Sequence, residues 1–249
     1  MKDKVVIITG GGSGIGFGIA EAFAERKAKL TITGRTESKL NKAKEKLEKT
    51  YDTKVLAVAA DGKDEDAVKN AINKTLEAYG KIDVIVNNAQ ASKSGVMLAD
   101  HSLEDFNLAL HTGLYGTFNY MKYGFEHLKE SKGSVINFAS GAGLAGRPGQ
   151  SSYAAAKEGI RGLSRVAATE WGPHGINVNV VCPLAMTKAL EKWREEYPKL
   201  YEKTIQDVPM GRFADQKEDI GKLCVFLASD GKYITGETIS VQGGSGLRP

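Results

Sequence analysis

The sequence predicts an α/β fold, a doubly wound parallel sheet in a three-layer, single domain over residues 1–249. Two observations predict it. Short apolar segments alternate along the chain with segments whose apolar residues recur three or four positions apart. The apolar segments hold few polar residues, as is typical of strands buried on both faces of a parallel sheet. A chain of 249 residues suits one large domain, and no repeat or linker divides it.

Seven apolar segments are expected to be the strands. They cover residues 5–8, 30–33, 55–58, 82–86, 135–138, 177–181 and 238–241. Helical periodicity is found between them, around residues 15–23, 40–47, 68–79, 103–129, 152–171 and 217–228. Ligands of such sheets bind at the carboxyl ends of the strands, so the residues directly after each strand are the expected functional positions.

The segment 186–213 interrupts this alternation and is expected to be an insertion over one end of the sheet. Its large apolar residues recur three or four positions apart, which is the spacing of one helix face. They are Leu190, Trp193, Tyr197, Leu200 and Tyr201. Two interpretations stay open. These side chains either pack against the body of the domain or form an apolar lid over the substrate.

The composition argues against several classes of protein. A net charge of +4, from 34 basic and 30 acidic side chains, gives no reason to expect a nucleic acid or an anionic membrane as partner. No apolar run approaches the roughly 18 residues of a membrane span, and the run after Lys4 is too short for a signal peptide. Cys182 and Cys224 form no paired motif, and the four histidines show no metal-binding spacing. We expect a soluble, cytoplasmic protein without a metal.

A glycine-rich turn follows the first strand and leads into a helix. It reads Thr9-Gly10-Gly11-Gly12-Ser13-Gly14-Ile15-Gly16. Glycines let backbone amides approach a pyrophosphate, and the N-terminus of the following helix favours that anion. Such a turn alone is weak evidence, since it also serves as a plain connection between strand and helix. Directly after the first strand it indicates a dinucleotide, held by Gly10, Ser13, Gly14, Ile15 and Gly16.

The end of the second strand indicates which dinucleotide is bound. Many NAD sites place an acidic residue there to hold the ribose hydroxyls, but this chain has Gly34, Arg35 and Thr36. An arginine can bind a 2′-phosphate, which a carboxylate repels, so we expect NADP(H) in preference to NAD(H). The turns after the third and fourth strands are expected to complete the groove with Asp61, Gly62, Asn87 and Ala89. The lysines of the next helix, Lys39 among them, are interpreted as its solvated face.

Three polar residues after the fifth strand have a spacing that suits proton transfer: Ser140, Tyr153 and Lys157. Tyr153 and Lys157 are four positions apart and share one face of a helix. A tyrosine has an ordinary pKa of about 10, and a neighbouring ammonium lowers that pKa, so the phenol becomes a usable acid and base. Ser140 can hydrogen-bond the substrate oxygen as charge develops on it. A Tyr-x-x-x-Lys pair alone is common; the glycine-rich turn and Ser140 turn the interpretation toward catalysis.

Along essentially its full length the chain resembles a classical short-chain dehydrogenase/reductase, with a Rossmann-type sheet. The matching motifs are Thr9-Gly10-x-x-x-Gly14-Ile15-Gly16, Asn87-Asn88-Ala89, Ser140, Tyr153-x-x-x-Lys157 and Asn179-x-x-x-Pro183 leading to Thr187. The resemblance implies that Tyr153 is the general acid/base, that Ser140 orients the carbonyl, and that Lys157 tunes Tyr153 and holds the nicotinamide ribose. It also implies a homotetramer paired through the two long middle helices, and cofactor contacts at Tyr153, Lys157, Pro183 and Thr187.

Three positions depart from the family pattern. Gln90 stands where the family has a glycine after Asn-Asn-Ala, and Leu184 stands where it has a glycine after Pro183. Gly113 stands where many members carry an asparagine that helps to hold a water in the proton relay. The missing side chain leaves room at Gly113 for a different water or for substrate. How protons reach the site therefore stays open.

We expect an oxidoreductase that transfers a hydride between NADP(H) and a carbonyl or secondary alcohol. The apolar, aromatic segment 186–213 suits a bulky apolar substrate, such as a hydroxysteroid or a 3-oxoacyl group. Two alternatives stay open: a reductase of activated double bonds in acyl thioesters, and a non-catalytic dinucleotide sensor on the same fold. Intact Ser140 and Tyr153 favour the carbonyl reaction.

Overall fold

One parallel sheet forms the centre of the fold. The computed structural model describes residues 1–246, apart from the side chains of residues 188 and 189. Its strands lie in the order β3-β2-β1-β4-β5-β6-β7. They are β1 (Val5–Thr9), β2 (Lys29–Gly34), β3 (Val55–Ala59), β4 (Val84–Asn87), β5 (Ser134–Phe138), β6 (Asn177–Pro183) and β7 (Thr238–Val241). The strand order reverses between β1 and β4, so the doubly wound sheet predicted from the sequence is confirmed.

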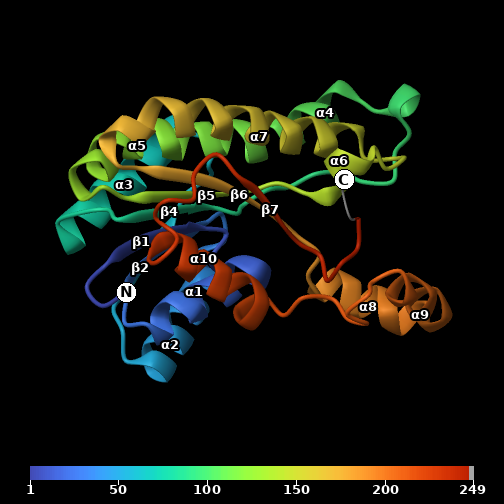
Figure 1. Ribbon diagram of the computed structural model, residues 1–249, viewed down its shortest axis with the longest axis horizontal. Coiled ribbons are helices and arrows are strands. Elements are labelled where there is room, and N and C mark those ends of the chain that lie inside the picture. Colours follow the sequence, from blue (N-terminus) through green and yellow to red (C-terminus); the bar gives the residue numbers. More distant parts are fainter. Residues whose placement is uncertain (247–249) are drawn as a thin grey trace.

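Helices cover both faces of this sheet, as Figure 1 shows. On one face lie α3 (Glu65–Tyr79), α5 (Gly116–Ser131) and α7 (Ser151–Trp171). On the other face lie α1 (Gly14–Glu25), α2 (Glu37–Tyr51) and α10 (Lys222–Ala228), the last preceded by the π-helical turn η4 (Gln216–Gly221). The three layers expected from the alternating pattern are therefore present.

β1 shows how one apolar strand serves two cores. All of its residues are buried. Val6 and Ile8 pack on the side of α1 and α2, in a cluster with Phe23. Ile7 packs on the opposite side, in a cluster with Tyr120 of α5. Because burial of a side chain of this size stabilises the fold by about 1.5–3 kcal/mol, a polar residue anywhere in β1 would weaken one core or the other.

The long middle helix contains a π-helical turn. The helix expected over residues 103–129 is observed as three consecutive parts: α4 (Leu103–Ala109), η2 (Leu110–Tyr115) and α5. A π-helical turn widens the helix locally and is frequent at functional sites. Gly113 lies in η2 and is buried. Apolar periodicity predicts the helix but not this turn, because the pattern continues through it.

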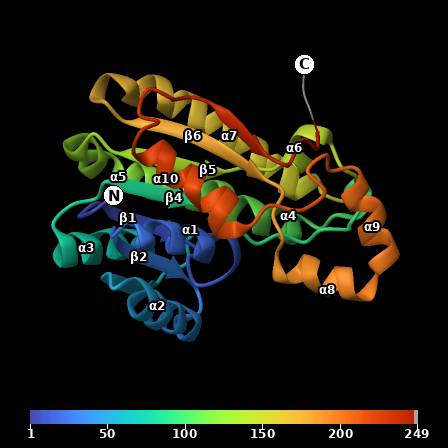
Figure 2. The same cartoon turned by 60° about the horizontal axis from the view of Figure 1, so that its bottom comes forward.

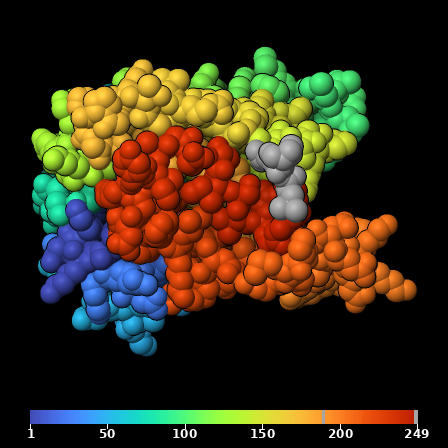
Figure 3. Space-filling view, viewed as in Figure 1, coloured from blue at the N-terminus to red at the C-terminus, as the bar shows by residue number. Residues whose placement is uncertain are grey.

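The segment 186–213 forms two helices, α8 (Lys188–Glu196) and α9 (Pro198–Gln206). Pro198 begins the second helix, and because proline cannot continue a helix it separates the two. The single helix face expected here is therefore divided. In Figures 2 and 3 the two helices form an orange lobe that stands out from the body. We call this segment the 186–213 lobe.

Asp83 joins the amino ends of β1 and β4. Its carboxylate accepts hydrogen bonds from the Lys4 ammonium and the Val5 backbone N–H, both at 2.8 Å, and pairs with Lys81 at 3.0 Å. The Asp83 side chain is only 4% exposed. Burial acts to raise the pKa of Asp83, but the hydrogen bonds from Lys4, Val5 and Lys81 outweigh it and hold the pKa below its ordinary value of 3.8.

We expect Asp83→Asn to lower the free energy of unfolding by about 1.5–3 kcal/mol, the range for hydrogen bonds to a charged group. Because the folded pKa is depressed, the stability that Asp83 contributes is present above its unfolded pKa, near 3.9, and is lost as the pH falls through the folded pKa. Denaturant unfolding at about pH 7 and about pH 3 measures both effects. A difference between variant and wild type that does not shrink at the lower pH would contradict the role of the charge.

Candidate active site

The turn between β1 and α1 presents an open helix N-terminus. Ser13 is the N-cap of α1; among the described residues its side chain makes no capping hydrogen bond, and the first turn holds no acidic residue. The Ser13 hydroxyl and the positive end of the helix dipole are therefore available to an anion. Gly16 permits a close approach, since a Cβ there would collide with the Gly10 carbonyl and lie 2.7 Å from Asn88 Nδ2. This geometry fits the pyrophosphate of a dinucleotide.

A cavity of about 320 Å³ lies among the loops that follow β1, β2, β3 and β4. This is the position that the doubly wound topology predicts for a ligand. Of the residues expected to bind the cofactor, the cavity is lined by Gly10, Ser13, Arg35, Thr36, Asp61, Gly62 and Ala89. Gly14, Ile15 and Gly16 follow Ser13 directly in the first turn of α1.

Lys39 lines the same cavity, which the sequence interpretation did not foresee. It lies near the start of α2, whose N-cap Thr36 makes no side-chain capping bond to the described residues. Two cations, Arg35 and Lys39, therefore line the cavity together with Thr36 at one helix N-terminus. This arrangement suits a phosphate group. Periodicity grouped Lys39 with the solvated lysines of α2. Its place three residues after the N-cap is the signal that separates it from them.

Asn87 and Asn88 point to opposite sides. Asn87 is buried, and its Nδ2 donates to Asn137 Oδ1 of β5 at 2.8 Å. Asn88 lines the cavity, and its backbone N–H, like that of Ala89, donates to Thr9 Oγ1 at 3.0 Å. Successive side chains of a strand alternate in direction, so only one of the two asparagines can face the groove. The Asn87 side chain therefore makes a bridge between β4 and β5.

Ser140, Tyr153 and Lys157 come together beyond the end of β5. Ser140 is the N-cap of the short helix α6 (Gly141–Ala145), and its Oγ accepts a hydrogen bond from Ala142 N at 3.2 Å. Tyr153 and Lys157 lie one turn apart near the start of α7, with the Lys157 ammonium 5.6 Å from the centre of the Tyr153 ring. Lys157 is buried and donates to the carbonyl oxygen of Phe138, the last residue of β5, at 2.8 Å.

Burial sets the protonation of these groups. It lowers the pKa of Lys157 to about 8, against an opposing effect of Cys182. Burial also raises the pKa of Tyr153 above its ordinary value of 10, although a hydrogen bond with Ser140 acts to lower it. The lowered pKa expected for Tyr153 is therefore not found in the protein alone, because desolvation of the phenol outweighs the hydrogen bond with Ser140. A lysine with a pKa of about 8 can both hold and release a proton in the physiological range.

The space beside Gly113 is filled. A Cβ at Gly113 would lie 2.8 Å from Cδ and 2.9 Å from Oε1 of Gln90. The side chain of Gln90, itself a departure from the family pattern, therefore occupies the space that the sequence left open for water or substrate. Nothing in the sequence connects the two positions, because residues so far apart share no periodicity.

The connection from β6 to α8 holds the remaining residues expected at the cofactor. Pro183 ends β6, and Leu184 donates its backbone N–H to Val241 of β7 at 2.8 Å. Thr187 is the N-cap of α8 and accepts a hydrogen bond from Leu190 N at 3.3 Å. Thr187 therefore starts the 186–213 lobe a few residues beyond the sheet.

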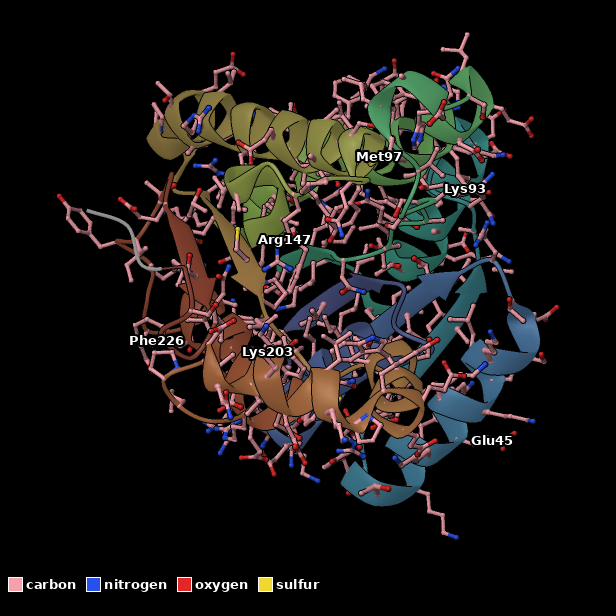
Figure 4. All side chains as sticks on the ribbon, turned by 90° about the vertical axis from the view of Figure 1, so that its right-hand side faces the viewer. Glu45, Lys93, Met97, Arg147, Lys203 and Phe226 are labelled. Carbon is pink, nitrogen blue, oxygen red and sulfur yellow. The ribbon has the colours of Figure 1, made fainter. Side chains whose placement is uncertain are left out.

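The apolar residues of the 186–213 lobe divide into two sets. The ring centres of Trp193 and Tyr201 lie 6.1 Å apart, and those of Tyr201 and Phe213 lie 5.7 Å apart, both edge to face. Tyr197 and Leu200 are 55% and 51% exposed. Packing within the lobe thus accounts for Trp193 and Tyr201, while Tyr197 and Leu200 remain as an apolar surface. Figure 4 looks onto the end of the molecule where α9 carries Lys203, with Arg147 and Met97 above it.

Residues 1–246 contain no group of three or more His, Cys, Asp or Glu side chains that could hold a metal ion. None of the helices in this range combines the length and the apolar character needed to cross a membrane. Cys182 and Cys224, on β6 and α10, are both buried.

The chain is similar in sequence to enzymes over nearly its whole length. A family model described as enoyl-(acyl carrier protein) reductase matches residues 10–246. A 12α-hydroxysteroid dehydrogenase from a Clostridium species is 57% identical, covering 99% of this chain and 98% of that protein. A 3-oxoacyl-[acyl-carrier-protein] reductase from Chlamydia muridarum is 36% identical, covering 98% of each.

Solved structures share the fold. Levodione reductase superposes with a TM-score of 0.92 at 32% sequence identity, covering 98% of each chain. NAD⁺-bound xylitol dehydrogenase superposes with a TM-score of 0.91 at 26% identity, covering 98% of this chain and 99% of the other. Sequence and structure thus point to the same kind of protein.

Proposed function

We propose, from the premise that the chain belongs to the classical short-chain dehydrogenase/reductase family, that it is an NADP(H)-dependent 12α-hydroxysteroid dehydrogenase. The chain is an oxidoreductase of alcohol and carbonyl groups; the steroid substrate and the choice of cofactor are the proposed part. The observation that carries the proposal is the 57% identity to a 12α-hydroxysteroid dehydrogenase over 99% of the chain. The 3-oxoacyl reductase is a more distant relative, at 36%.

The chain's own residues supply the proton chemistry in this proposal. A bound nicotinamide would supply the hydride chemistry at the steroid carbon. During oxidation Tyr153, as phenolate, takes the proton of the hydroxyl group; during reduction it returns a proton to the carbonyl oxygen. Ser140 hydrogen-bonds that oxygen and stabilises its partial negative charge. Lys157 holds the nucleotide ribose, and as a cation it favours the phenolate.

The exposed apolar side chains of the 186–213 lobe favour the proposal of a bulky apolar substrate. Tyr197, Leu200 and Met210 are exposed apolar side chains of this segment. A rigid steroid skeleton can cover such a surface, and each Å² of apolar area that it removes from water contributes about 25 cal/mol. The lobe begins directly after the end of β6, close in the chain to the catalytic end of the sheet. We therefore propose that it acts as a lid over the substrate.

The placement of Ser140 supports a carbonyl or alcohol group over the two alternatives. A hydroxyl beside Tyr153 suits a reacting carbon–oxygen bond, because charge develops on that oxygen as the hydride is transferred. A non-catalytic sensor would need the nucleotide cavity but not Ser140, Tyr153 and Lys157 together. Their convergence beyond β5 therefore favours catalysis.

Charge supports NADP(H) over NAD(H). Arg35 and Lys39 line the cavity beside Thr36, and Gly34 puts no carboxylate at the end of β2. The two cofactors differ by a 2′-phosphate, which two nearby cations stabilise.

A homotetramer in the cytoplasm completes the proposal. Tyr115 and Phe118, on the middle helix, and Val166, on α7, are exposed apolar side chains. Apolar side chains gathered on exposed helices are typical of surfaces through which subunits pair. The buried cysteines, Cys182 and Cys224, suit a reducing compartment.

We expect the wild-type protein to oxidise a 12α-hydroxysteroid with NADP⁺ and to leave the 12β epimer unchanged, because only one face of the carbon can be turned to the nicotinamide. Tyr153→Phe should lower kcat at least 100-fold, roughly the loss of a general acid/base, and leave the Kd for NADPH within about twofold. Tyr233→Phe, at a fully exposed tyrosine, is the matched control. Absorbance of NADPH follows turnover. Near-normal turnover of Tyr153→Phe would refute the catalytic assignment, and activity only on 3-oxoacyl thioesters would refute the substrate.

Removing either cation beside Thr36 should weaken NADPH more than NADH. We expect Arg35→Ala to raise the Kd for NADPH by roughly 10-fold to 100-fold, and Lys39→Ala by somewhat less, in line with about 1.5–3 kcal/mol for a hydrogen bond to a charged group. The Kd for NADH should change by less than about twofold in both. Lys42→Ala, an exposed lysine of the same helix outside the cavity, is the control. Equal losses for the two cofactors would show that these cations do not contact the 2′-phosphate.

Sedimentation velocity at micromolar concentration tests the assembly. We expect a tetramer for the wild-type protein, and a smaller species for Phe118→Glu, because a buried unpaired carboxylate is costly at a subunit interface. A wild-type monomer would contradict the proposal. A tetramer that is unaffected by Phe118→Glu would place the contact elsewhere on the surface.

A further inference from the structure

Gln90 carries a buried carboxamide that the protein does not satisfy. The residue lines the nucleotide cavity, on the loop that follows β4. Both its Oε1 and its Nε2 are shielded from solvent, and among residues 1–246 neither has a hydrogen-bond partner. An amide that is buried in this way costs free energy unless it meets a polar group, so unsatisfied native groups mark places with a further role.

The seat of this carboxamide is Gly113. Any Cβ at Gly113 would lie 2.8 Å from Gln90 Cδ and 3.2 Å from its Cγ, closer than atoms approach without a shift. The two positions are therefore complementary: Gly113 of η2 has no side chain, and the side chain of Gln90 fills the space. Thr112 fixes this arrangement, since its Oγ1 accepts from Ala91 N at 3.0 Å and donates to Ala91 O at 2.9 Å.

This seat adjoins the catalytic residues on two sides. In the sheet, Asn87 of β4 pairs in register with Asn137 of β5, so Gln90 and Ser140 each lie three residues beyond a matched pair. Neighbouring strands are about 4.8 Å apart. On the helical side, the residue after Gly113 is Leu114, whose side chain would lie 2.8 Å from a Cβ at Gly159 of α7. The turn η2, against which the carboxamide lies, therefore packs on the part of α7 that carries Lys157.

Lys157 has donors to spare in the same region. An ammonium has three N–H groups, and the described partner of Lys157 is the carbonyl of Phe138. A buried ammonium and a buried carboxamide with open hydrogen-bonding capacity, carried by neighbouring elements, are the kind of groups that an ordered water bridges, since such a water needs two to four polar partners. Because both polar atoms of the Gln90 amide are buried, we infer that its partner is such a water and not the nucleotide itself.

We propose that Gln90 is a positioning residue for proton transfer: seated over Gly113, its carboxamide orders the water through which Lys157 exchanges protons with solvent. This inference rests on the proposed roles of Tyr153 and Lys157. A side chain that only filled the space would be better apolar, since a methionine occupies the same volume without an amide to satisfy. The carboxamide of Gln90 is therefore the part of the side chain that filling the space does not explain.

Gln90→Met tests the carboxamide, because it keeps the length of the side chain and removes its hydrogen bonds. With NADPH and the 12-oxosteroid we expect kcat to fall at least about 10-fold, as for loss of one proton-transfer group, while the Kd for NADPH and the melting temperature stay close to wild type. Imidazole, a small proton carrier, should restore part of the kcat of Gln90→Met. It should not restore Tyr153→Phe, which lacks the proton-donating group itself.

A double variant tests the pairing with Gly113. Gln90→Gly combined with Gly113→Asn moves the carboxamide from the loop to the helix, and we expect it to recover kcat relative to Gln90→Gly alone. Gly113→Asn by itself should be slower than the double variant, because both side chains compete for one space. If Gln90→Met fails to fold, this comparison decides the matter.

The outcomes are distinguishable from those of the proposed function. If Gln90→Met matches wild type in kcat and in its pH profile while Tyr153→Phe is inactive, Gln90 only fills space and the inference is wrong. A Gln90→Met whose loss lies entirely in the Kd for NADPH would also overturn it, as would a double variant no faster than Gln90→Gly. If Tyr153→Phe stays active, the proposed function fails first.

Discussion

The hydrogen bond from Lys157 to the carbonyl of Phe138 is the interaction on which the rest of the catalytic end depends. It joins α7 to the last residue of β5 at 2.8 Å. The strand that leads to Ser140 and the helix that carries Tyr153 are thereby fixed to each other. The bond also offsets the cost of enclosing an ammonium whose pKa burial lowers to about 8. A charge held at such cost is typical of a functional site and unusual in a purely structural role.

The two parts of the site follow different strands of the parallel sheet. The loops after β1, β2, β3 and β4 form the nucleotide cavity, while the residues to which we assign the proton chemistry follow β5. The Asn87–Asn137 bridge lies at the boundary of the two halves, where β4 pairs with β5. Because both halves are extensions of neighbouring strands, their spacing follows from the sheet and not from the loops. The surface that would meet substrate comes from elsewhere, in the 186–213 lobe.

Much of this organisation is readable from the amino-acid sequence, because it follows local rules. Alternating apolar segments predict the sheet, and spacing from strand ends predicts the turn at Gly10 and the pair Tyr153 and Lys157. The misses share a different cause. Periodicity separates the faces of a helix but not its first turn, so it gives no sign that the exposed Lys39 also lines the cavity. It does not reveal that Pro198 divides the lobe. The contact of Gln90 with Gly113 joins distant parts of the chain and depends on packing, which no local pattern encodes.

The fit of Gln90 over Gly113 also constrains how this chain could have descended from ancestors with the usual family pattern. With a side chain still at position 113, the carboxamide at position 90 cannot keep the position it has here, since even a Cβ comes within 2.8 Å of it. Loss of the side chain at 113 alone leaves only a small void, which proteins tolerate at modest cost. The order of substitutions that avoids a clash is therefore glycine at 113 first and glutamine at 90 second. Reversal must take the opposite order, so the two residues are expected to be inherited as a linked pair.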